Sequence, residues 1–487
     1  MNKPIRRVSV FCLVLVLALL IRVNWVQGVD AGALNSNTHN ARVAIEAYSH
    51  PRGRIIVGGQ AVTGSVLVNG NKYTYVDSFP QGPMYAPVTG YSSALFGSSL
   101  LEGVEDPLLS GKDPRLAADS VEALLTGKPK QGGDVVTTID PRVQAAAYKA
   151  FVSGGKTGAA VAVDPQTGAI LALVSAPSYD PGVFASGGTA SGPAYTKLLH
   201  DPANPMLNRA LRQTYPPGST FKLVTAAAAL ETGVVTDIHA ATDTPDPLPL
   251  PESTTPLSNE DNDPCRNASM IDALAVSCNT VFAKFGDQVG NARMAQEADK
   301  FGFNNPTLNI PVRVDASVFD SGINRPSNML SSIGQYDTRA TPLEMAMVAA
   351  AICNNGSLMQ PYLVAEERAA DKSVISRTQP KQLSQATTPA VAAQIQTMMV
   401  DVVQQGTGTT AQIPGVTVGG KTGTAQHGVN NAGNPYAWFV SYAKAPNGKD
   451  IAVAVVVEAS DTQRSEISGS GLAAPIAKQM MSTYLAG

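Results

Sequence analysis

The sequence carries little charge and little cysteine, and it shows no repetition. Of its 487 residues, 15% are charged, and the net charge at neutral pH is −3. A basic surface for a nucleic acid is therefore not expected. There are only four cysteines and five histidines. Because no Cys/His spacing suggests a metal site, we expect neither a metal nor a cofactor. The chain has no low-complexity tract, and its hydrophobic content of 44% is typical of a folded protein.

Glycine and proline are abundant, with 43 and 34 residues. This composition predicts many turns, and the chain is too long for one ordinary domain. Short extended pieces, such as residues 54–57 and 72–76, are separated by turn residues over the first third of the chain. Residues 127–133 are typical of a linker. We therefore predict a smaller, β-rich domain over residues 27–133 and a second domain over residues 134–487.

The longest apolar stretch lies near the N-terminus. Three basic residues within positions 1–7 precede residues 8–26, an apolar run interrupted by Arg22, whose side chain can reach the interface. This run has about the length that a bilayer requires, and no convincing cleavage site follows it. We predict a single-pass membrane anchor over residues 8–26; a cleaved signal peptide is the alternative. The basic flank places residues 1–7 in the cytoplasm and the working part of the chain outside the membrane.

The second domain alternates helical and extended patterns. A helical segment over residues 141–151 precedes two apolar runs, 159–163 and 169–174, that flank a hairpin signature. A mostly helical middle follows, and then come three strand candidates and a last helix, at residues 416–419, 438–442, 451–457 and 473–485. Strands at both ends with helices between them predict an α+β fold, whose sheet joins distant parts of the chain.

A candidate nucleophile stands at the start of a predicted helix. Prolines at 216 and 217 cannot lie inside a helix, whereas residues 220–230 form one readily, so Ser219 lies at a helix N-terminus. Lys222 follows one turn later on the same face. A serine nucleophile needs a nearby base and a positive field on the oxyanion, and this arrangement supplies both. The alternative is an ordinary N-cap serine followed by a solvated lysine.

The S-x-x-K spacing alone proves little, because the chain contains others. Ser153 and Lys156 have the same spacing, and Lys156 also begins a K-T-G sequence, but these lie in a glycine-rich turn. Ser441 and Lys444 repeat the spacing at the end of a strand candidate. The order and the structural context of several motifs must therefore decide.

Two further motifs follow Ser219 in the chain. Ser277-Cys278-Asn279 is the only S-x-N sequence and lies within a helical stretch over residues 270–285. Lys421-Thr422-Gly423-Thr424 comes directly after a strand candidate. Taken singly, each is a polar turn. S-x-x-K, S-x-N and K-T-G in this order match the known signature of penicillin-binding proteins and class A β-lactamases.

The resemblance extends beyond these motifs to the class B penicillin-binding proteins. Residues 135–181 are similar to the opening of their transpeptidase domain, and residues 215–222 match their active-serine segment almost letter for letter. Further similar segments are residues 84–91 and 101–102 of the pedestal, or dimerisation-like, domain, and residues 208–210, 332–335 and 341–343. The one departure is Cys278, where many relatives carry Asp or Ser. The resemblance implies an antiparallel sheet with helices on both faces, and a role in cell division and cell shape.

The resemblance also implies the role of each residue. Ser219 attacks the penultimate D-Ala carbonyl of a peptidoglycan stem peptide, with Lys222 as its base, and the same serine is the covalent target of β-lactams. Ser277 passes a proton to the leaving amine, and Asn279 holds the substrate amide. Thr422, Gly423 and Thr424 bind the substrate, with Thr422 and Thr424 on its carboxylate, aided by the charge of Lys421. Backbone N–H groups of Ser219 and Thr424 form the oxyanion hole. Such enzymes commonly work beside a membrane glycosyltransferase.

The four cysteines fit an extracytoplasmic location. Cys12 lies in the apolar segment, and Cys353 lies in a small-residue helix and is expected to be a buried thiol. Cys265 and Cys278 are close in sequence and would face an oxidising compartment, which favours a disulfide between them. Two unpaired buried thiols are the alternative.

Two rival functions share the acylable serine. A β-lactamase or D,D-carboxypeptidase would hydrolyse the acyl-enzyme, but no glutamate-rich signature for a class A β-lactamase follows Asn279. A β-lactam sensor would pass a signal inward, but only about seven residues lie before the anchor. The transpeptidase remains the favoured interpretation.

Overall fold

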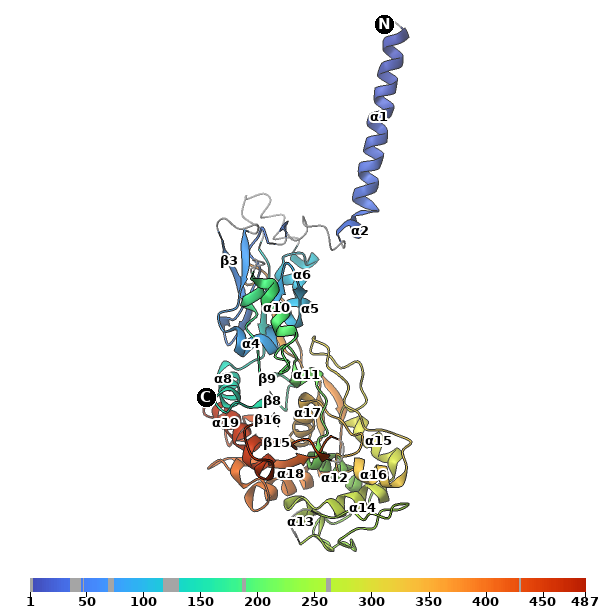
Figure 1. Cartoon of the computed structure of the whole chain (residues 1–487), viewed down its shortest axis with the longest axis vertical. Helices are drawn as coiled ribbons and strands as arrows, with labels where there is room; N and C mark the ends of the chain where they lie inside the picture. Colours follow the sequence, from blue (N-terminus) through green and yellow to red (C-terminus); the bar gives the residue numbers. More distant parts are fainter. Residues whose placement is uncertain are drawn as a thin grey trace.

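The computed structural model describes residues 3–35, 45–46, 48–68, 74–116, 131–185, 190–259, 264–428 and 431–487. Residues 127–130 of the predicted linker and residues 72–73 of a predicted strand lie outside these ranges. Helix α1 (Lys3–Gly28) stands away from the body, followed by a small domain and then a larger one (Figure 1). By length and composition α1 can cross a membrane, and none of its residues is buried.

A five-stranded antiparallel sheet forms the centre of the larger domain. Its order is β14 (Thr417–Ala425), β15 (Tyr436–Lys444), β16 (Asp450–Ala459), β8 (Thr157–Val163) and β9 (Ile170–Ala176). The C-terminal strand β16 pairs with β8, which lies almost 300 residues earlier in the chain, with Ala452 opposite Val163. The predicted hairpin and the joining of distant segments in one sheet are confirmed.

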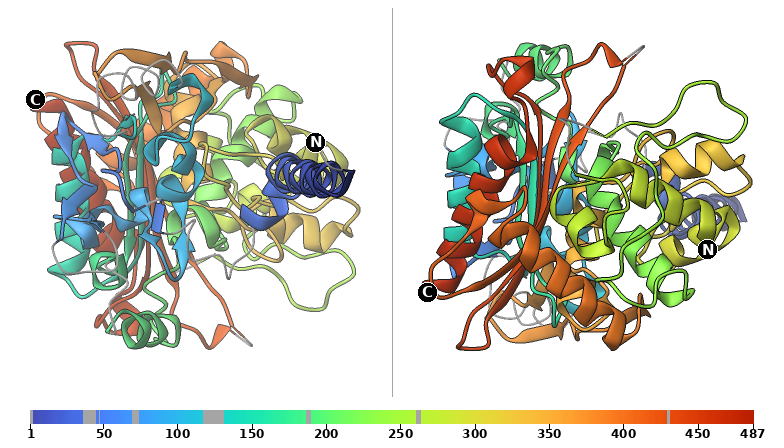
Figure 2. Two further views of the ribbon diagram at one scale, coloured as in Figure 1. Left: turned by 90° about the horizontal axis from the view of Figure 1, so that it is seen from above. Right: turned by 90° about the horizontal axis from the view of Figure 1, so that it is seen from below.

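Helices cover both faces of this sheet (Figure 2). Helices α8 (Pro141–Val152) and α19 (Ala474–Leu485) pack on one face, and α17 (Pro342–Cys353) and α18 (Pro389–Gln404) pack on the other. Alternate residues of a strand enter different cores. Ala160 packs in the core on the side of α8 and α19, and Val161 packs in the core on the side of α17 and α18. Because both faces are buried, β8, β9 and β16 are nearly continuous apolar runs. The predicted α+β fold class is confirmed.

The smaller domain is built on a second sheet that uses distant segments. Its order is β12 (Val374–Arg377), β11 (Val364–Arg368), β7 (Asp134–Thr137), β1 (Ile55–Val57) and β2 (Gln60–Ala61). Strand β7 pairs in parallel with β1, and the Arg54 backbone and guanidinium both donate to the Asp134 carboxylate. Three strands from beyond residue 133, β7, β11 and β12, thus complete the N-terminal sheet, which crosses the boundary predicted between residues 133 and 134.

The remaining elements are mostly short. In the smaller domain they are α2 (Ala31–Asn35), β3 (Gly64–Leu67), β4 (Tyr75–Ser78), α4 (Gly82–Thr89), β5 (Ser92–Ser93), β6 (Gly97–Ser98), α5 (Leu100–Val104), α6 (Asp106–Leu109) and η1 (Pro114–Leu116). Helices α9 (Gly182–Ala185) and α10 (Ser191–Leu199) come later in the chain but pack against the smaller domain (Figure 1). In the larger domain the remaining elements are α11 (Arg209–Arg212), η2 (Gly218–Phe221), α12 (Lys222–Glu231), α13 (Met270–Ala275), α14 (Asn279–Val289), α15 (Asn291–Lys300), α16 (Arg325–Ser331), β10 (Ser357–Met359), β13 (Gln382–Gln385), η3 (Thr409–Ala411), η5 (Arg464–Glu466) and η6 (Gly469–Ala473).

Glu344, in the first turn of α17, is a buried acid that makes stability depend on pH. Burial raises the pKa of its carboxyl group to about 8. The folded state therefore keeps the proton above pH 4.5, where the unfolded chain releases it. The contribution of this carboxyl group to the free energy of unfolding is therefore fully present at low pH. It decreases by on the order of 4 kcal/mol as the pH rises from about 4.5 to 8.

We expect Glu344→Gln to remove this loss. The free energy of unfolding of the variant should exceed that of the unchanged protein at pH 8 and approach it at pH 5, as measured by denaturant titration at both pH values. Other titrating groups contribute equally to both proteins, so the difference isolates Glu344. A difference that does not change with pH would contradict the burial of a protonated acid.

Candidate active site

Ser219 lies in η2, the single turn that leads directly into α12. Its position is set by backbone contacts of the residues before it. The indole Nε1 of Trp438 donates to the Pro216 carbonyl at 3.0 Å, and the Gly218 N–H donates to the Gly334 carbonyl at 2.9 Å. Gly218 has a φ of +53°, and a Cβ on Gly334 would collide with the Gly218 carbonyl. The expected position of the serine at the beginning of a helix is thus confirmed.

Lys222, the first residue of α12, has a fully buried side chain. Its Nζ donates to the Ser277 carbonyl at 2.6 Å and to Asn279 Oδ1 at 2.7 Å, and it lies 3.3 Å from Ser277 Oγ. An ammonium group buried in this way needs such acceptors to offset its lost hydration. The first motif is therefore joined directly to the second.

Ser277 lies in a turn between α13 and α14, so the prediction of one helical stretch over residues 270–285 is wrong at this point. Ser277 has a φ of +69°, which interrupts the helix and aims its hydroxyl into the site. The predicted disulfide between Cys265 and Cys278 is present beside it, with Cα atoms 5.6 Å apart. Cys353 is a buried free thiol, as expected.

Asn259, which the sequence analysis missed, holds the start of α14 from outside the helix. Its Oδ1 accepts from the backbone N–H groups of Asn279 at 2.6 Å and Thr280 at 3.0 Å, and its Nδ2 donates to Thr280 Oγ1. It therefore acts as the cap for a helix whose own N-cap residue, Cys278, makes no side-chain cap bond. The sequence does not predict this capping role, because Asn259 precedes the helix by 20 residues and belongs to no motif.

Lys421 approaches the same serine from the sheet. Its buried Nζ donates to Ser277 Oγ at 2.9 Å and to the Thr422 carbonyl at 3.1 Å. The motif was expected after a strand, but it lies inside β14, which stays paired with β15 up to Ala425. Two lysines from different elements thus share one hydroxyl. Both donate to Ser277 Oγ, so the oxygen lone pairs accept and its proton remains available for another acceptor.

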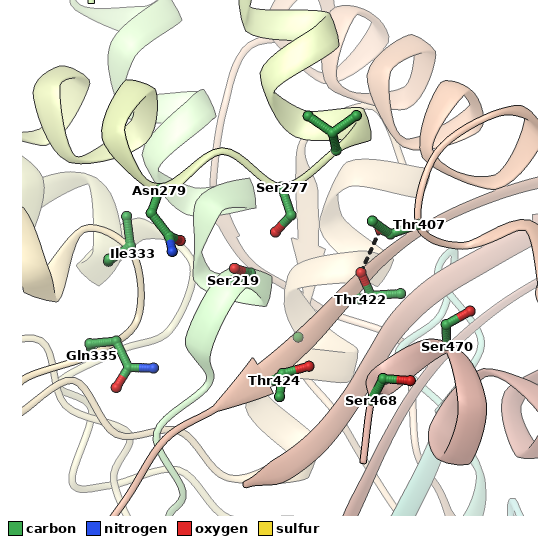
Figure 3. Close-up of a pocket in the computed structure, with 13 residues that line it drawn as sticks. Ser219, Ser277, Asn279, Ile333, Gln335, Thr407, Thr422, Thr424, Ser468 and Ser470 are labelled. Carbon is green, nitrogen blue, oxygen red and sulfur yellow. Dashed lines mark hydrogen bonds between the residues drawn. The ribbon is translucent and has the colours of Figure 1, made fainter. Parts of the chain in front are cut away.

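A cleft of about 330 Å³ opens between the helices and β14 (Figure 3). In Figure 3 the hydroxyls of Ser219 and Ser277 and the amide of Asn279 face a common space, with Thr422 and Thr424 on the opposite strand. The lining residues are Ser219, Val276, Ser277, Asn279, Ile333, Gln335, Thr407, Thr422, Gly423, Thr424, Ser468, Gly469 and Ser470. In the described part of the chain, none of the lining residues is acidic.

The cleft brings together all six predicted site residues with uncharged side chains, and both lysines lie directly behind it. The serines of the two other S-x-x-K sequences do not line the cleft. Ser153 Oγ donates to the Lys149 carbonyl, and Ser441 is buried inside β15. Thr407 and residues 468–470 were missed, since they lie far from the motifs in sequence. Gln335 was noted only within a resembling segment.

The fold and this site define a penicillin-binding serine transpeptidase architecture, and the chain belongs to that family. The family model described as the penicillin-binding protein transpeptidase domain matches residues 158–482. That of the penicillin-binding protein A dimerisation domain matches residues 52–135. The family and fold expected from the sequence are confirmed.

The similar proteins include full-length relatives. The peptidoglycan D,D-transpeptidase PbpA of Mycolicibacterium smegmatis is 41% identical over 100% of this chain and 99% of its own. The protein of the same name from Mycobacterium tuberculosis is 39% identical, with 100% of both chains covered. The structure of penicillin-binding protein A from M. tuberculosis, as a ceftriaxone acyl-enzyme complex, has a TM-score of 0.85 and 40% identity, over 91% of this chain and all of that one.

Proposed function

We propose that this protein is a peptidoglycan D,D-transpeptidase that cross-links stem peptides through an acyl-enzyme on Ser219. The observation that carries this proposal is the Ser277 hydroxyl, which accepts hydrogen bonds from the buried Nζ atoms of both Lys222 and Lys421 beside Ser219. This arrangement places two proton-carrying lysines on the hydroxyl that lines the cleft together with Ser219. Burying two like charges is costly, so a buried lysine pair is expected where function requires it.

The reaction has two transfers. Ser219 Oγ attacks the penultimate D-Ala carbonyl while its proton passes to Lys222, which acts as the base in its neutral form. The C–N bond to the terminal D-Ala then breaks as Ser277 gives its proton to the leaving amine, and Lys222 restores that proton to Ser277 Oγ. An amine of a second stem peptide then attacks the ester, forming the cross-link and returning the proton to Ser219. Backbone N–H groups of Ser219 and Thr424 stabilise the oxyanion.

Residues in the walls of the cleft bind the substrate. Asn279 holds the amide of the donor peptide, and the hydroxyls of Thr422 and Thr424, next to Gly423, bind its terminal carboxylate. The positive charge of Lys421 in the same strand favours that carboxylate. β-Lactams occupy the same cleft and acylate the same serine.

The proposal includes the location of the enzyme. Residues 8–26 within α1 anchor the chain, residues 1–7 are cytoplasmic, and both the pedestal (27–133) and the transpeptidase domain (134–487) lie outside the membrane. Figure 1 supports this arrangement, since the larger domain lies at the end of the molecule away from α1. A membrane glycosyltransferase is the expected partner, because cross-linking needs newly made strands.

Labelling with penicillin followed by peptide mapping tests the proposal. The full chain in detergent should gain the mass of one penicillin molecule, and the modified peptide should contain Ser219. With a stem-peptide thioester and an amine acceptor, the product should be the cross-linked peptide. Hydrolysis without transfer would indicate a carboxypeptidase, and modification elsewhere would refute the assignment of the nucleophile.

A further inference from the structure

The hydroxyl of Thr422 has one hydrogen-bond partner in the described part of the chain, and that partner belongs to no motif. Thr407 Oγ1 lies 2.6 Å from Thr422 Oγ1, as the dashed line in Figure 3 shows. Both side chains line the cleft. Thr407 lies between α18 and η3, so a loop outside the strand contacts the carboxylate-binding wall.

The backbone around Thr407 is fixed by the opposite wall. The Thr407 N–H donates to the Ala275 carbonyl at 3.0 Å, at the end of α13 and two residues before Ser277. The loop passes so closely that a Cβ on Gly406 would collide with the same carbonyl. Thr407 therefore joins the wall that carries Ser277 to the wall that carries Thr422.

The direction of the hydrogen bond decides what Thr422 offers to a ligand. A hydroxyl has one proton and two lone pairs. If Thr422 donates to Thr407, only its lone pairs face the cleft, and these repel a carboxylate. If Thr407 donates, the Thr422 proton is free for the ligand, and the two bonds in series strengthen each other.

We propose that Thr407 is a positioning residue that donates to Thr422 and so commits the Thr422 hydroxyl to donate to the substrate carboxylate. This inference rests on the proposed function and adds a residue that sets preference for ligands ending in a carboxylate. Thr407 touches no reacting atom. Its effect therefore depends on the ligand: it is large for an acid and absent for a neutral analogue.

The test compares penicillin G with its methyl ester, which lacks the carboxylate. Second-order rate constants for acylation are measured by intact mass on the full chain in detergent. Thr407→Val should slow acylation by penicillin G about fivefold, because Thr422 loses the neutral hydrogen bond that keeps its proton directed at the carboxylate. The same change should alter the methyl-ester rate by less than about twofold. Thr407→Ser keeps the hydroxyl and should stay within about threefold of the unchanged protein.

Thr409→Val is the matched control, because Thr409 is exposed in the same segment and should leave both rates unchanged. Adding Thr407→Val to Thr422→Val should cause little further loss, since the partner is already absent. Equal slowing with both ligands, or an unchanged penicillin G rate in Thr407→Val, would overturn the proposal. Failure of the proposed function looks different: the unchanged protein would then not be acylated on Ser219 by either ligand.

Discussion

Replacing Ser219 by alanine should abolish covalent labelling by penicillin while leaving the protein folded. Acylation needs the Ser219 oxygen, and among the described residues that line the cleft only Ser219 precedes a buried lysine by one helical turn. In the described residues the Ser219 side chain is not part of a hydrogen bond that holds the fold. Removing it should therefore change the free energy of unfolding by no more than about 0.5 kcal/mol.

The measurement is labelling with fluorescent penicillin beside thermal unfolding of the same sample. Ser153→Ala is the control, because Ser153 has the same spacing to a lysine but bonds to the Lys149 carbonyl far from the cleft. The control should label normally. Labelling that persists in Ser219→Ala, or that maps to Ser153, would contradict the site.

The acyl-enzyme with penicillin should persist long after the free drug is removed. Hydrolysis of the ester needs a base to activate water, and the lining residues within the described ranges include no Asp or Glu. The natural reaction needs no water, because the acceptor peptide brings its own amine. With penicillin the leaving group stays tethered to the acyl group and blocks that approach. The M. tuberculosis relative has been captured as a penicillin G acyl-enzyme complex.

Decay of the labelled protein is followed by intact mass after excess drug has been removed. An added acceptor amine should accelerate release of the acyl group derived from a stem-peptide thioester, but not of the penicillin-derived one. A penicilloyl half-life of seconds, with catalytic destruction of the drug, would instead identify a hydrolase.

Local signals in the sequence were sufficient for much of the larger domain. The apolar runs at residues 159–163 and 169–174 became the β8–β9 hairpin, because short β-branched and alanine-rich runs around a turn have few alternatives. The prolines before Ser219 fixed where the helix could begin. Such signals act over a few residues and can be read without knowing the fold.

Local signals gave the wrong secondary structure at the second and third motifs. The stretch at 270–285 has helical composition throughout, but the contacts of Lys222 and the disulfide at Cys278 stabilise a turn at Ser277. The strand predicted over residues 416–419 stops at Gly419, although β14 continues through Gly419 and Gly420 to Ala425. Cβ atoms there would collide with Tyr442 and Phe439, so these glycines serve close packing and do not end the strand.

By itself the sequence determined the family, the fold class and the three motifs, because these depend on residue identity and short spacing. Only the tertiary structure decided that Lys222 and Lys421 meet at Ser277, that Asn259 caps α14, and that Thr407 reaches Thr422. These contacts join residues 15 to 144 positions apart. Each depends on how a loop packs against a distant element, and side-chain pairing at that range leaves no periodic or spacing signal in a single chain.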